Sequence, residues 1–339
     1  MNRYRVALVG AGRHGLRYAR HVIADFPQLE LAGIWRRDQA EAQRSATELG
    51  CRHFADYREL IAAPGVDLVI VAVPPALHPD IVEHCAAARR AVLLEKPAAI
   101  DLDAGRRMRI AVQRAGTPLM VAQTLRFNGV VKAIKQAIAE IAPIHALRIS
   151  QRFEPSRPGW VDQPELSGGG VMMLTGIHSF DMARHLSDLE AVACCAEISR
   201  VGTTVQTEDN FGAVITFGDA RVIASIAGSR ATASRSGPIE IAGANGTLIA
   251  DHVLNVAILV RGNVVTPIDV GPPLPTVRET LQAFVSAVDR GGQMPVTLDD
   301  GLRAVAIARA CFDSAKSGRR VAVAAFDAEH LSVSQATEL

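Results

Sequence analysis

The sequence contains few aromatic residues and has almost no net charge. Aromatic side chains make up 4% of the 339 residues, which leaves little for stacking on nucleic-acid bases. The 36 basic and 35 acidic residues give a net charge of +1, so no overall positive field favours a polyanion. These two absences argue against nucleic acid as a partner.

Long apolar runs and metal-ligand patterns are also missing from the sequence. No stretch approaches the roughly 20 apolar residues that span a bilayer. The run from Val6 to Val9 is too short for the core of a signal peptide. The five cysteines form no C-x-x-C pair, which favours reduced thiols, a cytoplasmic protein and no bound metal.

A glycine-rich turn follows the first predicted strand, Tyr4 to Val9. Residues 10–15 read GAGRHG, and apolar residues then recur at helical spacing. Gly10 would permit the tight turn, Gly12 would let the backbone approach a pyrophosphate, and Gly15 would let helix and strand pack closely. The following helix N-terminus would offer N–H groups to phosphates. The pattern predicts a dinucleotide site, and a glycine-rich turn without a ligand is the alternative.

The end of the second predicted strand, residues 29–35, bears on the choice of dinucleotide. NAD-binding folds usually place an acid there for the ribose 2′-hydroxyl, whereas arginine accommodates a 2′-phosphate. Arg36 stands at that position with Arg37 beside it, and a guanidinium can bind phosphate in bidentate fashion. We therefore expect NADP rather than NAD, although Asp38 keeps NAD possible and both arginines could simply be solvated.

Strands and helices continue to alternate as far as Gln123. Residues 66–73 read as a buried strand that ends at Pro74, and His78 opens the next helix. The alternation predicts right-handed crossovers and a doubly wound parallel sheet. Ligands collect beyond the carboxyl ends of such strands, so Lys96, which follows the apolar run 91–94, would stand at the mouth of a cofactor crevice. A surface lysine before a turn proline is the alternative.

The second half of the chain is predicted to be an α+β domain with a large, mostly antiparallel sheet. Neither face of residues 222–227 carries a charge, so we expect helices on one face and another subunit on the other. Thr276 and Glu279 predict a capping box, and a last helix is expected over residues 299–317. The expected domains are 1–123, which binds the dinucleotide, and 124–339, which binds substrate and forms oligomers. The strand-like runs are residues 144–148, 191–198, 211–217, 221–227 and 253–260.

Several motifs together resemble the Gfo/Idh/MocA oxidoreductase family of glucose-fructose oxidoreductase and inositol dehydrogenase. The resemblance implies a Rossmann domain, a C-terminal open sheet that forms dimers or tetramers, and hydride transfer between nicotinamide and a sugar, sugar acid or polyol. The motifs are the glycine turn 10–15, the loop 74–78, Glu95-Lys96-Pro97, and the segments 123–127, 168–181, 208–210 and 301–304.

The resemblance also implies a catalytic pair. The family lysine maps to Lys96 and the histidine of its Asp-x-x-x-His pair maps to His178, but Leu174 stands where the aspartate would be. An apolar neighbour disfavours a charged amine and would lower the lysine pKa from about 10.4. We expect Lys96 to act as general base in alcohol oxidation and His178 to orient the hydroxyl. A histidine satisfied in the helix interior is the alternative for His178.

Leu174 keeps two other functions open, namely a reductase of another carbonyl or imine, and a catalytically silent NADP-binding sensor or assembly subunit. The arginines in the second half hint at an acidic or phosphorylated sugar, with a solvated loop as the alternative. The predicted substrate-binding residues are Arg126, Trp160 and Asp181, with Arg152 and Arg157 nearby. The predicted cofactor-binding residues are Gly10, Gly12, Arg13, His14, Gly15, Arg36, Arg37, Pro74, His78, Glu95, Lys96 and Pro97.

Overall fold

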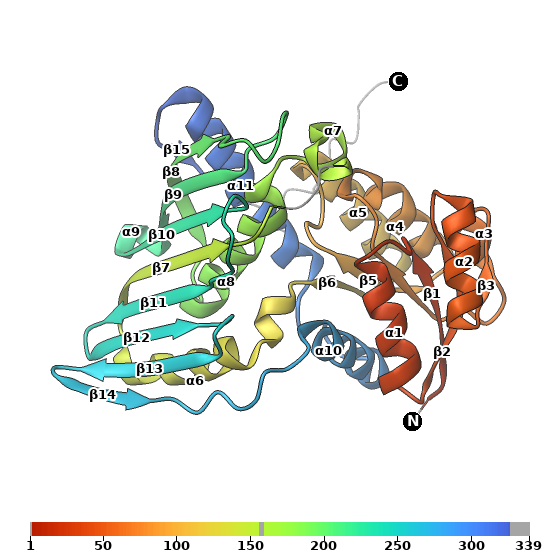
Figure 1. Cartoon of the computed structure of the whole chain (residues 1–339), viewed down its shortest axis with the longest axis horizontal. Helices are drawn as coiled ribbons and strands as arrows, with labels where there is room; N and C mark the ends of the chain where they lie inside the picture. The colour runs from red at the N-terminus through yellow and green to blue at the C-terminus, as the bar shows by residue number, and fades with distance from the viewer. Residues whose placement is uncertain (1, 156–158, 326–339) are drawn as a thin grey trace, which may run out of the picture.

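The computed structural model describes residues 2–155 and 159–325 and contains two sheets, each with its own hydrophobic core (Figure 1). The first sheet is entirely parallel, in the order β3-β2-β1-β4-β5-β6. Its strands are β1 (Tyr4–Val9), β2 (Leu29–Trp35), β3 (Arg52–His53), β4 (Leu68–Val71), β5 (Ala91–Glu95) and β6 (Leu119–Ala122). The predicted doubly wound sheet is confirmed, and its strand order reverses between β1 and β4, where such folds bind dinucleotides.

Five helices connect these strands: α1 (Gly15–Asp25), α2 (Gln39–Leu49), α3 (Tyr57–Ala62), α4 (His78–Ala87) and α5 (Leu102–Ala115). The strands are buried on both faces because helices cover both, which explains their continuous apolar sequences. Side-chain caps mark the starts of α2, α3 and α5. Asp38 accepts from the Glu41 N–H, Asp56 from the Arg58 N–H, and Asp101 from the Ala104 N–H.

The second sheet has nine strands in the order β14-β13-β12-β11-β7-β10-β9-β8-β15. Within the described part of this second sheet, only β7 and β10 pair in parallel, which confirms a mostly antiparallel sheet. The strands are β7 (Ile144–Arg152), β8 (Ala191–Ser199), β9 (Asn210–Phe217), β10 (Val222–Ser229), β11 (Pro238–Gly243), β12 (Gly246–Asp251), β13 (Val256–Arg261), β14 (Val264–Pro267) and β15 (Val321–Ala322).

Two local predictions in this half are wrong. The run 253–260 is not one strand, because a turn with Asn255 at φ +58° precedes β13. Thr276 does not cap α10 (Thr276–Arg290), because Pro275 takes the cap position and leaves Thr276 already inside the helix. The capping box belongs instead to α11 (Leu298–Ser317), where Thr297 and Asp300 exchange hydrogen bonds.

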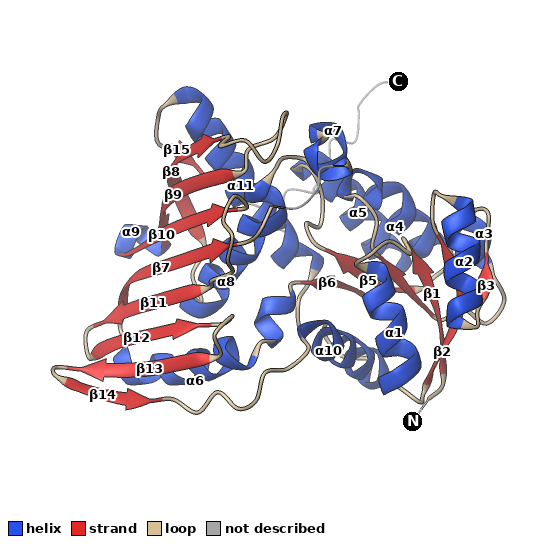
Figure 2. Cartoon of the chain, viewed as in Figure 1, coloured by secondary structure: helices blue, strands red, loops and turns tan. Residues whose placement is uncertain are grey.

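Helices cover one face of the large sheet: α6 (Gly129–Ile141), α8 (Ile177–Ser187) and α11 (Figure 2). The opposite face of this chain exposes apolar side chains, including Val214, Ile223 and Ile249 at 48%, 51% and 41%. Helix α10 returns to the first domain, where its apolar face joins the parallel-sheet core. None of the described helices is long and apolar enough to cross a bilayer.

Five short elements complete the described chain: α7 (Pro164–Ser167), α9 (Gly218–Arg221), and the 3₁₀ turns η1 (Pro75–Leu77), η2 (Thr124–Phe127) and η3 (Trp160–Asp162). A π-helical turn, η4 (Met172–Gly176), precedes α8 without a break. Such turns are frequent at functional sites.

Candidate active site

The glycine turn after β1 has the geometry of a phosphate cradle. Gly10 has φ +106°, and a Cβ there would lie 2.4 Å from the Ala72 carbonyl oxygen. A Cβ on Gly15 would lie 2.0 Å from the Gly10 carbonyl oxygen, so helix and strand meet without room for a side chain. At Gly12 a Cβ would meet nothing within 4 Å. The turn therefore leaves open space at the start of α1, which fits the pyrophosphate of a dinucleotide.

The two arginines after β2 lie beside the start of α2. Arg36 Nη1 lies 3.4 Å from Glu41 Oε2, and Arg37 is exposed. Asp38 Oδ1 accepts the Glu41 N–H at 3.0 Å, so its carboxylate caps the helix. The position usual for a ribose-binding acid thus carries a guanidinium, and the nearest acid in sequence already has a backbone donor.

Glu95 at the end of β5 ties the glycine turn to the neighbouring strand. Its Oε1 lies 2.8 Å from His14 Nε2 and accepts from the Tyr18 hydroxyl at 2.6 Å, while Oε2 accepts the Lys96 N–H at 3.1 Å. Burial alone would raise the pKa of Glu95, but His14, Lys96 and Tyr18 lower it to about 2. Glu95 is therefore a fixed anion that orients the turn.

His78 does not face the cleft that its predicted cofactor role requires. Its ring is fully buried, and its two nitrogens lie 3.1 Å and 3.0 Å from the carbonyl oxygens of Val73 and Ala98. The side chain thus holds the loop after β4 against the loop after β5. Direct contact with the cofactor is not supported, because the α4 start turns the imidazole inward.

Lys96 projects from the end of β5 toward the second domain. Its Nζ donates to the Leu174 carbonyl oxygen at 2.8 Å. That carbonyl belongs to η4, where the wider π-helical turn changes the usual helical pairing. Burial lowers the pKa of Lys96, Glu95 opposes this, and Arg230 adds to it. The amine is therefore easier to deprotonate than an ordinary lysine.

His178 stands on α8, one turn after Leu174. Burial lowers its pKa well below the ordinary value, and the nearby Lys96 charge contributes. Its Nδ1 is buried and has no hydrogen-bond partner among the described residues. A neutral imidazole with an unsatisfied nitrogen is suited to bonding a substrate group.

These residues share a cavity of about 450 Å³ between the parallel sheet and the second domain. It brings together Lys96, His178, Arg13, His14, Glu95 and Trp160 of the predicted site. Arg36, Arg37, Pro74 and Pro97 do not line it. The lining also contains Phe153, Arg230 and Arg235, which the sequence did not single out. Phe153 and Arg230 directly follow β7 and β10, which pair side by side, and Arg235 lies in the connection from β10 to β11. No local signal in the sequence marks them, because the pairing of distant strands brings them to the cavity.

Arg126 and Asp181 do not line this cavity. They pair with each other, with Arg126 Nε and Nη2 donating to the two carboxylate oxygens at 2.8 Å and 2.6 Å. Asp300 of α11 lies 3.3 Å from the same guanidinium. The predicted substrate contacts are thus not supported, since a buried network joins η2, α8 and α11. Arg152 also lies outside the cavity lining, and Arg157 lies outside the described residues.

We expect Arg126→Met to destabilise the fold by about 3–5 kcal/mol, because it leaves the buried Asp181 carboxylate without its bidentate partner. Urea unfolding measures the change. A double variant with Asp181→Leu should recover part of it, since both charges are then removed. A loss below about 1 kcal/mol in the single variant, as for a surface pair, would contradict the assignment.

Comparison with known proteins agrees with this arrangement. The family model described as "Oxidoreductase family, NAD-binding Rossmann fold" matches residues 4–123, and "Oxidoreductase family, C-terminal alpha/beta domain" matches residues 131–323. The chain belongs to the Gfo/Idh/MocA oxidoreductase family. It is accordingly an NAD(P)-dependent oxidoreductase, and a nicotinamide dinucleotide is its cofactor.

Several relatives are named for reactions of sugars or polyols. The inositol 2-dehydrogenase of Rhizobium meliloti (strain 1021) is 28% identical over 94% of this chain and 99% of that protein. The 1,5-anhydro-D-fructose reductase of Ensifer adhaerens is 30% identical over 81% of this chain and 85% of that protein. The crystal structure of GenD2 from gentamicin A biosynthesis, in complex with NAD, matches with a TM-score of 0.84 and 26% identity, covering 96% and 97% of the two chains.

Proposed function

We propose that this member of the family transfers a hydride between NADP(H) and a CH–OH or C=O carbon of a sugar, sugar acid or polyol. The observation that carries the proposal is the position of the Lys96 amine. It lies in a cavity between the glycine turn and α8, and the Leu174 carbonyl holds it in place. The substrate class of the relatives supports the same assignment.

Each residue has a defined task in alcohol oxidation. Lys96, whose pKa burial lowers, takes the hydroxyl proton at Nζ, and in carbonyl reduction it returns that proton. His178, neutral and with Nδ1 free of protein partners among the described residues, bonds the same hydroxyl. The bound nicotinamide supplies the hydride acceptor or donor. Leu174 and Trp160 add apolar surface that excludes water.

The charge of the cavity favours an acidic substrate within this class. Four arginines line it, Arg13, Arg17, Arg230 and Arg235, against the acids Glu95 and Glu154. Glu95 is bound by His14 and Tyr18, and Glu154 accepts from Arg235 at 2.7 Å. The guanidinium groups in the lining thus outnumber the carboxylates, and both carboxylates are already bonded within the protein, which favours an anionic group on the substrate.

Turnover measured over a panel of polyols, neutral sugars and uronates, with NADP and with NAD, tests the proposal. We expect activity with at least one member and higher kcat/KM for acidic sugars than for their neutral counterparts. Tight NADPH binding without turnover of any panel member would support a silent sensor instead. Turnover confined to imines or non-sugar ketones would support the reductase alternative, which the apolar Leu174 favours.

We infer a preference for NADP from the guanidinium groups after β2. Replacing Arg36 and Arg37 together by alanine should raise KM for NADPH by roughly tenfold or more, because charge-assisted bonds to the 2′-phosphate are lost. KM for NADH should change little, and Arg290→Ala on α10 serves as the control. Equal effects on both cofactors would contradict the preference.

We also propose that the exposed face of the large sheet joins a second copy of this chain. Val214 and Ile223 lie on that face in the adjacent strands β9 and β10, and Ile249 lies further along the same sheet on β12. Monomers rarely leave such apolar side chains uncovered in a patch. Ile223→Glu should convert an oligomer to smaller species in light scattering. A wild-type monomer at micromolar concentration would contradict the proposal.

A further inference from the structure

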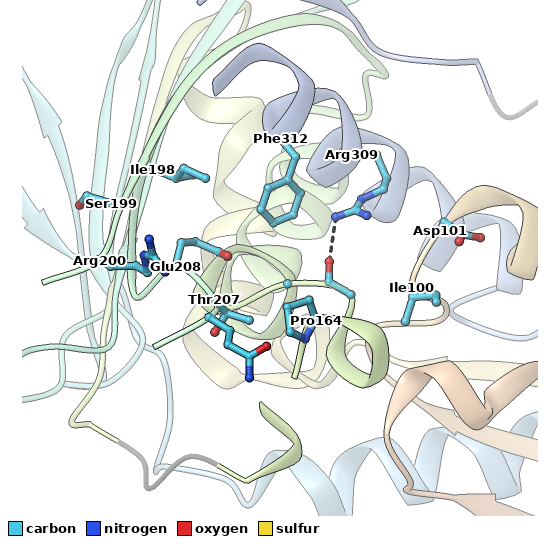
Figure 3. Close-up of a pocket in the computed structure, with 13 residues that line it drawn as sticks. Ile100, Asp101, Pro164, Ile198, Ser199, Arg200, Thr207, Glu208, Arg309 and Phe312 are labelled. Carbon is cyan, nitrogen blue, oxygen red and sulfur yellow. Dashed lines mark hydrogen bonds between the residues drawn. The ribbon is translucent and has the colours of Figure 1, made fainter. Parts of the chain in front are cut away.

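A second cavity, here called the Arg309 cavity, lies beside the glycine segment 168–170 (Figure 3). Its volume is about 840 Å³. It shares no lining residue with the cavity of about 450 Å³ that contains Lys96 and His178. Four separate segments form it: the loop after β5, the glycine segment, the connection from β8 to β9 and the last half of α11. The proposed catalytic reaction uses none of these side chains.

Arg309 on α11 points into this cavity with most of its donors unused. Its Nη2 donates to the Gly168 carbonyl oxygen at 2.8 Å, and its guanidinium carbon lies 4.6 Å from the Phe312 ring centre. An arginine carries five N–H donors. Its Nε has no partner, and the described residues provide it with no ion pair. The side chain is thus stacked and oriented. No described carboxylate lies within ion-pair distance of it, although Asp101, Asp313 and Glu208 act on its charge from farther away.

The two acids in the wall are already bonded to the backbone. Glu208 accepts the Gly170 and Met172 N–H groups, one on each carboxylate oxygen, both at 2.9 Å. Asp101 accepts the Ala104 N–H at 2.8 Å as the cap of α5. Hydrogen bonds from backbone N–H groups therefore hold both side-chain carboxylates in the wall of the cavity.

A second guanidinium reaches the same cavity from the β8–β9 connection. Arg200 is exposed, its Nη1 donates to the Val205 carbonyl oxygen, and it forms no ion pair within the described part of the chain. Ile198 and Phe312 place apolar surface between the two arginines. Two oriented cations with an apolar floor suit a ligand that has an oxyanion and a small apolar body.

We propose that the Arg309 cavity is a second ligand site, which binds a small oxyanion, a carboxylate or a phosphate, through Arg309 and Arg200. A carboxylate and a phosphate each carry two or more oxygens that can accept a pair of N–H bonds from one guanidinium. The site is separate from the cofactor cradle, so its occupation does not depend on the reaction at Lys96.

Calorimetric titration of the full chain tests this site. NADP is kept saturating so that its own phosphates fill the cofactor cradle, and inorganic phosphate and citrate are the two probes. We expect a saturable site whose affinity depends on Arg309 and Arg200. Saturable binding that is unchanged in both variants would place the anion in the cavity at Lys96 and overturn the proposal. Whichever probe binds more tightly identifies phosphate or carboxylate as the preferred group. Arg309→Gln and Arg200→Gln should each weaken binding roughly tenfold or more, because each removes a charge-assisted contact.

Arg290→Gln is the matched control, since that exposed arginine lies on α10 and does not line the cavity. It should leave the binding constant unchanged. Arg200→Gln changes an exposed side chain, so it remains informative if Arg309→Gln unfolds. Absence of saturable binding, or equal weakening in the control, would overturn the proposal and indicate an adventitious ion only. Neither result depends on turnover, so failure here is distinct from failure of the proposed function.

Discussion

Lys96→Met is expected to lower kcat for alcohol oxidation by about 10²–10⁴-fold, the range for loss of a general acid–base group. Methionine keeps the length and apolar character of the stem but removes the amine that bonds the Leu174 carbonyl. Cofactor affinity should change only a few-fold, because the glycine turn is untouched. Steady-state kinetics with the best panel substrate, together with NADPH fluorescence titration, measures both quantities.

The pH profile distinguishes proton transfer from a positioning role. Burial disfavours the charged amine, so the pKa of Lys96 lies below its ordinary value. The neutral amine accordingly forms at lower pH, and wild-type oxidation should rise with pH through that lowered pKa. Lys96→Met should lose this rise, while Lys316→Met, an exposed lysine at the end of α11, should keep it. Near-normal turnover in Lys96→Met would refute the assignment.

Gly12→Val should weaken dinucleotide binding by about a hundredfold, roughly 2.7 kcal/mol, while leaving the fold intact. A Cβ at Gly12 meets no protein atom within 4 Å, so the added side chain enters the space that the pyrophosphate needs. The expected loss comes from the backbone N–H contacts that the phosphates can no longer reach. NADPH fluorescence titration measures affinity, and thermal unfolding without cofactor measures the fold.

Gly10→Val is the contrasting control. Its Cβ would lie 2.4 Å from the Ala72 carbonyl oxygen, and φ +106° is unfavourable for any L side chain. This variant should lose stability without cofactor as well as binding. If Gly12→Val bound NADPH normally, or unfolded like Gly10→Val, the open space at Gly12 would not be the phosphate cradle.

The Rossmann half could be predicted closely because its signals are local. The glycine turn 10–15 and the apolar run before Lys96 each depend on neighbouring residues. The doubly wound parallel sheet follows the prediction. The same reasoning failed at Thr276, where a proline one residue earlier moved the helix start. The domain division at residue 123 stays a prediction, although α10 packs into the first core.

The candidate site was harder to predict because side-chain direction is not a local property. Arg126 and Asp181 suggested substrate contacts, but they are far apart in sequence and meet in a buried ion pair. His78 follows the expected loop, yet two backbone carbonyls draw it inward. Arg230 reaches the cavity only because β10 pairs with β7.

The sequence by itself determined the doubly wound half, the glycine turn after β1 and the lysine at a strand end, since backbone sterics and apolar periodicity act over a few residues. Tertiary structure alone decided which arginines line one cavity and which carboxylates form buried ion pairs. It also decided that the Lys96 amine bonds the Leu174 carbonyl oxygen of a π-helical turn 78 residues away. The physical reason is that burial and charge pairing depend on segments distant in sequence. Only the packed chain brings those segments within hydrogen-bond distance.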